Sequence, residues 1–320
     1  MDTNLARLQQ VTPPEAESFA DTMLDGLAKS PKEIACKYFY DEAGSRLFDQ
    51  ICELPEYYQT RTEVALLKRH AGEIAALMGN EVEIVEFGAG SLRKVRILLD
   101  AAHNPRAYTP LDISGDYLSD VVRVLAADYP ALTLRPLVGD FTRPLEIPAL
   151  STPSRRAGFF PGSTIGNFKP DAAMALLRRM RSNLNGGGLL VGVDLVKDPV
   201  RLHAAYNDAA GVTALFNKNL LARANRELGA DFDLDAFAHY APYNAAAHRI
   251  EMYLVSLKRQ TVTLAGRHFE FAQGEPLHTE DSHKYTIESF REMACRAGFS
   301  PRAVWTDEDR LFSMHWLESR

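Results

Sequence analysis

The segment Glu83-Ile84-Val85-Glu86-Phe87-Gly88-Ala89-Gly90-Ser91 decides the fold class of this 320-residue chain. It predicts a buried strand that runs into a glycine turn, and a second apolar stretch ends at Leu111-Asp112, about 20 residues later. This spacing is typical of a βαβ unit that binds a nucleoside. Its glycines let the main chain approach the ligand, and its acid binds the ribose hydroxyls. A purely structural strand-to-helix turn is the alternative interpretation of so short a motif.

The motif favours a nucleoside that carries no phosphate. The third glycine of the dinucleotide pattern G-x-G-x-x-G would fall at position 93, which is Arg93. Glu86, at the end of the first strand, would repel a pyrophosphate. These two residues disfavour a nicotinamide-dependent oxidoreductase and point to S-adenosylmethionine as the ligand.

The composition is that of an ordinary globular protein, with 46% hydrophobic and 24% charged residues. The net charge of -6 is spread along the chain without a basic block, which argues against a nucleic-acid partner. Neither an apolar N-terminal segment nor a run approaching 18 apolar residues is present, so we expect a cytoplasmic protein without a membrane partner. The 3 cysteines form no C-x-x-C pair and the 9 histidines show no H-E-x-x-H spacing, so we expect neither disulfides nor a metal.

Strand-like and helix-like periods alternate between residues 82 and 195. The expected strands are 82–87, 107–113, 132–138, 157–160 and 189–193, and the expected helices are 92–102, 117–128 and 171–184. Such alternation requires crossover connections and a parallel sheet with both faces covered. Ligands bind at the carboxyl ends of such strands, where Glu86, Asp112, Asp140 and Asn167 would converge. For Asn167, capping the next helix is the alternative interpretation.

The α/β pattern is interrupted after Val193 and returns at Thr286. In between we expect one or two helices over 199–229, an irregular aromatic segment over 231–247, and two antiparallel strands over 249–257 and 261–271. After it we expect a helix over 287–297 and strands near 302–305 and 311–317. The chain would thus form one domain from 61–195 plus 287–320. A second, smaller α+β lobe from 1–60 plus 196–286 would bind and cover the substrate.

Several further segments resemble one known family, the ergothioneine-pathway histidine methyltransferases. They are Lys37-Tyr38-Phe39-Tyr40-Asp41-Glu42-Ala43-Gly44-Ser45-Arg46-Leu47-Phe48, Leu54-Pro55-Glu56-Tyr57-Tyr58, Thr60-Arg61-Thr62-Glu63, Glu86-Phe87-Gly88-Ala89-Gly90-Ser91, Gly162-Ser163-Thr164-Ile165-Gly166-Asn167-Phe168, Arg249-Ile250-Glu251-Met252 and Thr279-Glu280-Asp281-Ser282. The resemblance spans residues 30 to 318, and the order of these unrelated motifs makes it far more specific than the glycine turn alone.

The resemblance implies a Rossmann-like class I methyltransferase sheet and an S-adenosylmethionine-dependent enzyme, here expected to be a monomer. Its substrate would be free L-histidine, whose α-amino nitrogen is methylated three times to give hercynine. The positions that match the family's cofactor contacts are Tyr40, Gly88, Lys94, Asp112, Asp140 and Phe141. Those that match its histidine pocket are Tyr58, Gly162, Asn167, Tyr206, Met252, Glu280 and Ser282. By the same resemblance Tyr40, Asn167 and Tyr206 are the candidate catalytic residues.

The chemistry of these residues agrees with that substrate. Glu280 and Ser282 are two residues apart, so in an extended segment both point to one face. The Glu280 carboxylate can accept an imidazole N–H while the Ser282 hydroxyl bonds the other ring nitrogen. Asn167 and Tyr206 offer neutral donors to a carboxylate, and the faces of Tyr40 and Phe48 suit a quaternary ammonium product. An N-methyltransferase of another aromatic amino acid, such as a tryptophan derivative, and a non-catalytic binding module are the remaining alternatives.

Overall fold

The computed structural model describes residues 8–11, 18–90, 92–150, 152 and 154–319. These residues form two compact units. The first contains strand β1 (Gln9–Gln10) and the described parts of 59–195 and 285–320, and the second contains the described parts of 15–58 and 196–284. Ser91 of the glycine motif, and the segments 1–7 and 12–17 that we expected in the second lobe, lie outside the described residues.

A nine-stranded sheet organises the first unit. Its further strands are β3 (Glu83–Phe87), β4 (Ala107–Asp112), β5 (Thr133–Leu134), β6 (Leu137–Val138), β7 (Arg156–Phe160), β8 (Gly188–Asp194), β15 (Phe299–Thr306) and β16 (Phe312–Ser319). The order is β1-β6-β4-β3-β7-β8-β16-β15, with β5 beside β4. The strands from β1 to β8 are parallel, whereas β16 and β15 are antiparallel to their neighbours. Strand order reverses at β3, so a crevice for ligands is expected beyond its carboxyl end.

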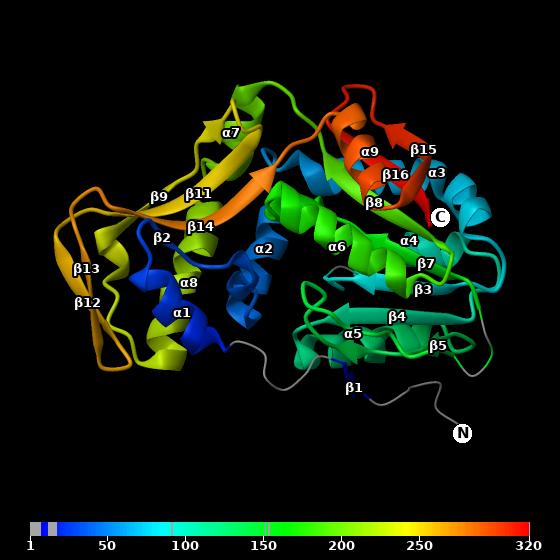
Figure 1. Ribbon diagram of the computed structural model, residues 1–320, viewed down its shortest axis with the longest axis horizontal. Helices are drawn as coiled ribbons and strands as arrows, with labels where there is room; N and C mark the ends of the chain where they lie inside the picture. Colours follow the sequence, from blue (N-terminus) through cyan, green and yellow to red (C-terminus); the bar gives the residue numbers. More distant parts are fainter. Residues whose placement is uncertain (1–7, 12–17, 91, 151, 153, 320) are drawn as a thin grey trace. The chain divides into compact units, whose positions relative to one another are not determined.

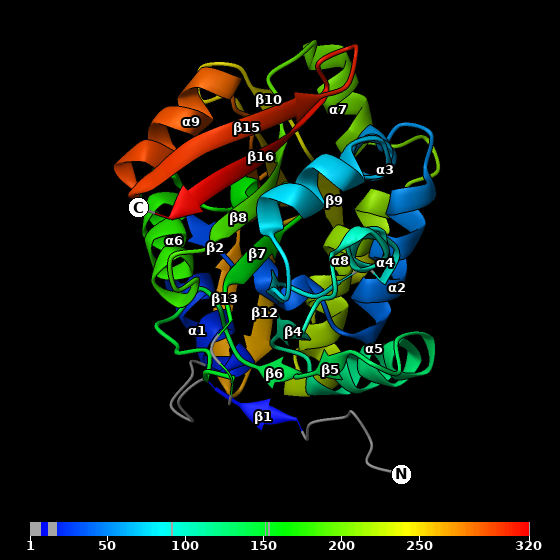
Figure 2. The same ribbon diagram turned by 90° about the vertical axis from the view of Figure 1, so that its right-hand side faces the viewer.

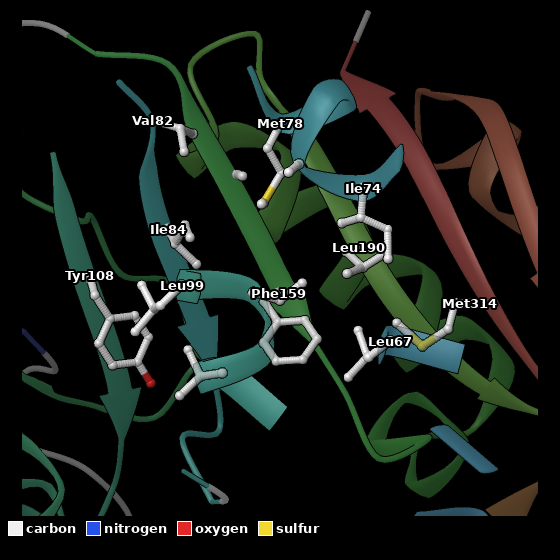
Figure 3. Packing of buried hydrophobic residues seen from close by; sticks show 14 of the residues in the cluster. Leu67, Ile74, Met78, Val82, Ile84, Leu99, Tyr108, Phe159, Leu190 and Met314 are labelled. Carbon is white, nitrogen blue, oxygen red and sulfur yellow. The ribbon is translucent and has the colours of Figure 1, made fainter. Parts of the chain in front are cut away.

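Five helices cover the two faces of this sheet. They are α3 (Tyr58–Met78), α4 (Leu92–Ala101), α5 (Gly115–Asp128), α6 (Pro170–Asn183) and α9 (Ile287–Arg296). Side chains alternate along β3, so Ile84 packs with α3, α4 and α5, and Val85 packs with α6 and α9. Figure 3 shows residues of the first of these layers, where Ile74 lies near Leu190 and Leu67 lies near Met314. Burial on both faces explains why the strands read as continuous apolar runs.

A buried ion cluster joins three strands at the end of the sheet opposite the glycine turn. The Glu83 side chain, 1% exposed, accepts hydrogen bonds from Arg156 Nε at 2.7 Å, Arg135 Nη1 at 2.6 Å and Thr109 Oγ1 at 2.7 Å. A buried carboxylate is tolerated only when such partners replace its water. Because Thr109 lies on β4 and Arg156 on β7, Glu83 fixes both neighbours of β3.

Replacing Glu83 by Ala should lower the free energy of unfolding by about 3 to 5 kcal/mol, because two arginines lose their buried counter-charge. Asp128→Ala is the control, since it removes the partner of Arg96 in an ion pair that is open to solvent, and it should cost less than about 1 kcal/mol. Urea denaturation followed by circular dichroism measures both. Equal losses of unfolding free energy in the two variants would show that the Glu83 cluster stabilises the fold no more than an exposed ion pair does.

The second unit combines a five-stranded sheet with helices (Figure 1). Its sheet contains β2 (Lys32–Glu33), β9 (Phe237–Tyr240), β10 (Tyr243–Asn244), β11 (Arg249–Ser256) and β14 (Pro276–His283). Its α-helices are α1 (Phe19–Ala28), α2 (Glu42–Glu53), α7 (Pro199–Tyr206) and α8 (Val212–Leu228), with short 3₁₀ turns η1 (Cys36–Phe39) and η3 (Leu234–Ala236). Strand β11 pairs with β14 on one side and with β9 and β10 on the other. Among the described helices of the chain, none has the length and apolar character to cross a bilayer.

The expected pairing of 249–257 with 261–271 was wrong. The second segment is itself a hairpin, β12 (Gln260–Leu264) and β13 (Arg267–Phe271), and it forms a separate two-stranded sheet. Its two turn residues, Ala265 and Gly266, both have positive φ, as a tight hairpin turn requires. The partner of β11 is β14, a polar strand that the apolar pattern did not reveal, and the segment expected to be irregular contributes β9 and β10.

Two details of the first unit also differ from expectation. The single strand expected over 132–138 is two short strands, because Pro136 between them has no N–H to donate to a ladder. Strand β1 pairs with β6 and therefore belongs to the large sheet, whereas we expected all of 1–60 in the second lobe. The final pair, β15 and β16, runs antiparallel across a short turn, which makes the sheet mixed rather than wholly parallel (Figure 2).

Candidate functional site

The glycine turn after β3 packs against the loop that follows β6. Gly88 has φ +75°, a conformation that side chains rarely adopt, and a Cβ there would lie 3.3 Å from Cε1 of Phe141. The main-chain N–H of Gly88 donates to Leu111 O at 2.8 Å, which holds the turn beside the end of β4. Glycine is therefore needed at this position for both its backbone angles and the close approach of Phe141.

Asp112 and Asp140 lie near this turn, at the carboxyl ends of β4 and β6. Burial raises the pKa of Asp112 to about 6, although its side chain accepts a hydrogen bond from the main-chain N–H of Ser114 at 2.9 Å. Asp140 is 8% exposed, and its Oδ1 accepts from the main-chain N–H of Thr142 at 2.9 Å. The main chain joins the two loops, since Gly139 N–H donates to Asp112 O at 2.9 Å. The two acids are thus neighbours at one edge of the sheet.

Glu86 is a buried acid with spare hydrogen-bonding capacity. Its Oε2 accepts from the Tyr108 hydroxyl, whereas Oε1 has no partner among the described residues. Burial raises the pKa of Glu86 to about 8, and the hydrogen bond from Tyr108 and the nearby Lys94 only partly oppose it. A cationic ligand beside Glu86 would favour its ionised form.

Lys94 and Gly162 meet at a buried carboxylate that the sequence analysis did not single out. Lys94 Nζ lies 2.6 Å from Oε2 of Glu63, and neither residue is more than 7% exposed. The main-chain N–H of Gly162, where φ is +78°, donates to both Glu63 oxygens at 2.9 and 3.0 Å. The charge of Lys94 is therefore balanced within the protein. Lys94 is thus held beside the turn after β7, and its expected role as a cofactor contact stays a prediction.

Asn167 ends the 3₁₀ turn η2 (Thr164–Asn167) that follows β7. The N-cap of α6 is Lys169, so the alternative interpretation of Asn167 as a helix cap was wrong. The half-buried carboxamide makes no hydrogen bond to any other described residue, which leaves its donors and acceptor for a ligand.

In the second unit, three of the expected histidine-binding residues share one face of the β11–β14 pair. Met252 lies directly opposite Glu280, and Ile250 lies opposite Ser282. Opposed residues of antiparallel strands point to the same side. Tyr206, the last residue of α7, reaches this face, where its hydroxyl is 2.7 Å from Ser282 Oγ. All four side chains of the expected set are buried.

A β-bulge produces this arrangement. The register shifts between Met252 and Tyr253, so that β14 carries one extra residue, Thr279, which has no partner in the ladder. Thr279 Oγ1 donates to Asn217 Oδ1 at 2.8 Å and to Met252 O at 3.1 Å, and Asn217 in α8 is 0% exposed. These bonds anchor Thr279 to α8 and to the main chain of β11, and the register shift puts Glu280 opposite Met252.

The same face carries Lys284, a residue that sequence reasoning missed. It follows Glu280 and Ser282 at the same two-residue interval and is 3% exposed. Its Nζ donates to Ser282 Oγ at 2.8 Å and to Tyr206 Oη at 3.0 Å. Burial raises the pKa of Glu280 to about 7, an effect that Lys284 partly opposes. The sequence could have indicated Lys284, because it follows Ser282 by two residues, just as Ser282 follows Glu280.

Aromatic rings form a continuous group in this unit. Tyr40 contacts Phe48 and Phe216 at centroid distances of 5.7 and 5.6 Å, and Tyr57 contacts Phe48 at 6.2 Å and Tyr206 at 6.5 Å. The group therefore reaches the ring of Tyr206, whose hydroxyl lies beside Ser282. Phe216 and Tyr57 had not been singled out from the sequence.

Tyr58 and Tyr40 are two further expected site residues that belong to the second unit. Tyr58 is 2% exposed and its hydroxyl accepts from Lys197 Nζ at 2.6 Å. Tyr40 was expected among the cofactor contacts, but it belongs to the second unit with most of the histidine set, whereas Gly162 and Asn167 of that set belong to the first. A site built from both groups stays a prediction.

The first unit defines a Rossmann-like α/β domain whose strand order reverses at β3, the place where such sheets bind ligands. A family model described as "Histidine-specific methyltransferase, SAM-dependent" matches residues 19–319, and the chain belongs to this family. It is 43% identical to the histidine N-alpha-methyltransferase of Mycolicibacterium smegmatis over 91% of this chain and 92% of that protein. It is 41% identical to the enzyme of the same name from Mycobacterium tuberculosis, over 90% of this chain and 91% of that protein. It is 29% identical to ergothioneine biosynthesis protein 1 of Neurospora crassa, over 86% of this chain and 32% of that longer protein.

Family membership confirms the expected class I methyltransferase fold and the dependence on S-adenosylmethionine, in place of a nicotinamide-dependent oxidoreductase. The first unit fits that cofactor. Gly88 has no side chain and permits a ligand to approach the main chain closely. Asp112 can accept hydrogen bonds from ribose hydroxyls, and Oε1 of Glu86, which has no partner among the described residues, can face a positive group. The individual residue roles remain predictions.

Asp112→Ala should weaken S-adenosylmethionine binding by about 1.5 to 3 kcal/mol, the range for hydrogen bonds to a charged group. Asp116→Ala is the control, because this acid lies exposed in the first turn of α5 and should leave the affinity unchanged. Titration calorimetry gives both affinities. If Asp112→Ala binds as tightly as the Asp116 control, the ribose assignment is wrong.

Cofactor binding should release a proton near neutral pH. With its pKa at about 8, Glu86 is mostly protonated at pH 7, and a nearby positive group would lower that pKa and ionise it. Affinity should therefore rise with pH up to about 8. Calorimetry at about pH 7 in two buffers of different ionisation enthalpy gives the number of protons released for each cofactor bound. Glu86→Gln, which cannot ionise at this position, should release fewer protons when the cofactor binds. Equal proton release from both proteins would contradict the placement of Glu86 beside the positive group of the cofactor.

Proposed function

We propose that this protein transfers three methyl groups from S-adenosylmethionine to the α-amino nitrogen of L-histidine, giving hercynine on the route to ergothioneine. The observation that carries the proposal is the buried face on which Glu280, Ser282 and Met252 lie together with the hydroxyl of Tyr206. A carboxylate and a hydroxyl two residues apart match the two nitrogens of an imidazole. The names of the mycobacterial and fungal relatives support the substrate and the pathway.

Bound S-adenosylmethionine would supply an activated methyl group, so the protein's task is to orient a neutral amine. Glu280 would accept the ring N–H and Ser282 would bond the other ring nitrogen, which fixes the imidazole. Asn167 offers a free carboxamide for the carboxylate of the amino acid. The pocket has no need of a strong base, because a neighbouring positive charge lowers the pKa of an ammonium group by like-charge repulsion.

The aromatic group suits the product. Each methylation increases the bulk of the nitrogen, and the third leaves a permanent cation that can no longer donate a hydrogen bond. The faces of Tyr40, Phe48 and Phe216 can stabilise such a cation by about 0.5 to 2 kcal/mol. A set of rings is therefore better suited than a carboxylate to hold all successive forms of the amine.

For this function the face formed by Met252, Glu280, Ser282 and Tyr206, the ring-binding face, would hold the imidazole. We further propose that the enzyme acts as a cytoplasmic monomer. Mass spectrometry of a reaction containing equal amounts of histidine, tryptophan and tyrosine with excess cofactor tests the function. Trimethylated histidine should be the main product, and preferential methylation of tryptophan or tyrosine would replace the proposed substrate.

Glu280→Ala should lower kcat/KM for histidine by about two to three orders of magnitude, because a site built to hydrogen-bond a polar ring loses most when its partner is removed. Activity on tryptophan or phenylalanine should fall much less or rise, since the pocket becomes larger and less polar. Glu270→Ala, which changes an exposed acid of β13, is the control and should alter neither. A uniform fall for every amino acid would assign Glu280 to folding or catalysis instead of ring recognition.

A further inference from the structure

Lys284 is a buried cation that touches two hydroxyl groups of the ring-binding face. Its ammonium group donates to Ser282 Oγ at 2.8 Å and to Tyr206 Oη at 3.0 Å, and these two oxygens are 2.7 Å apart. The three polar atoms thus form a closed triangle. An ammonium group has donors only, so both oxygens must accept from it.

The triangle restricts what the two hydroxyls offer a ligand. Together they have two protons, and the contact between them uses one, so a single proton remains for the ligand. The geometry allows either hydroxyl to donate in this contact. Because a phenol is the more acidic of the two groups and therefore the better donor, we assign the donated proton to Tyr206. Ser282 Oγ then accepts twice, from Lys284 and Tyr206. Its remaining capacity is to donate.

We propose that Lys284 is a positioning residue that fixes Ser282 as a hydrogen-bond donor, so that the pocket accepts the neutral imidazole in a single tautomer. The inference rests on the proposed function and assigns its ring chemistry. The ring N–H would point to Glu280 and the bare nitrogen to Ser282. An imidazolium would present a second N–H to a hydroxyl that can only donate, beside a fixed ammonium group.

The other titratable groups around Lys284 are compatible with this selection. Glu280 on β14 is the acid that attracts it, and His283, the last residue of that strand, precedes it. Tyr206 comes from α7 and Tyr243 from β10, and burial raises the pKa of Tyr243. Of these groups, Glu280 alone supplies a negative charge near neutral pH. Any ring that donates an N–H to Glu280 would require that charge equally. The ratio of the kcat/KM values for two such rings is therefore independent of the ionisation of Glu280.

The experiment is an internal competition between histidine and 1,2,4-triazolylalanine, whose ring stays neutral above pH 5. The product ratio, measured by mass spectrometry, gives the ratio of the two kcat/KM values directly. Ionisation of the α-amine affects both substrates alike. In the unmodified protein the ratio of histidine to analogue should fall about tenfold for each pH unit below about 6.5, the ordinary pKa of the imidazole.

In Lys284→Met the same ratio should change less than about threefold between pH 5 and 7, because Ser282 regains a lone pair and can accept from imidazolium. Lys32→Met is the matched control. Lys32 is also largely buried in the second unit, but it pairs with Glu275 at 2.5 Å and lies on β2, so it should retain the steep profile. A merely structural role of Lys284 would lower both rates without changing the slope, and an unchanged slope would overturn the proposal.

Ser282→Ala provides a second measurement if Lys284→Met does not fold. Removing the donor should make the profile less steep, since only the ammonium group of Lys284 then disfavours the imidazolium, and an unchanged profile in Ser282→Ala would overturn the proposal as well. Failure of the proposed function gives a different result, because the unmodified protein would then methylate neither ring compound. A flat ratio in an unmodified protein that methylates both would refute the role of Lys284 while leaving the function standing.

Discussion

The register shift between β11 and β14 is the constraint on which the ring-binding face depends. In a regular ladder Thr279 would stand opposite Met252, and Glu280 would point to the other side of the sheet. The bulge reverses this, and the bonds from Thr279 to Asn217 and to Met252 O hold it in place. Asn217 Nδ2 in turn contacts His239 Nδ1 at 2.9 Å, and His239 Nε2 contacts Tyr206 O at 2.8 Å. One asparagine thus positions both strands and the end of α7.

The large sheet was predictable because its strands are buried on both faces. Such strands appear in the sequence as short apolar runs with glycine-containing turns beside them, so β3, β4, β7 and β8 were expected within a residue or two of their observed bounds. Asp112, Asp140 and Glu86 followed from the rule that ligands of such sheets bind at strand ends. Their environment was not predictable, because the raised pKa of Glu86 depends on the burial supplied by distant segments.

The ring-binding face was predictable only in part. The two-residue interval from Glu280 to Ser282 placed them on one side, but β14 is too polar to be recognised as a buried strand, and nothing in its own sequence marks Thr279 as a bulge. Lys284 and Glu63 were missed for the same reason. A lysine or a glutamate is ordinarily exposed, and only contacts distant in sequence, with Tyr206 and with Gly162, reveal them as buried.

After β8 the chain leaves the large sheet, and it returns to it at the same point. Leu195 and Tyr285 are bridge partners, and Tyr285 N–H donates to Asp194 O at 3.1 Å. The segment between them therefore begins and ends where a short loop from β8 to α9 would. The entropy of closing such a loop grows only slowly with its length. Evolution can thus lengthen, shorten or replace the segment between Leu195 and Tyr285, while the large sheet keeps the same connections.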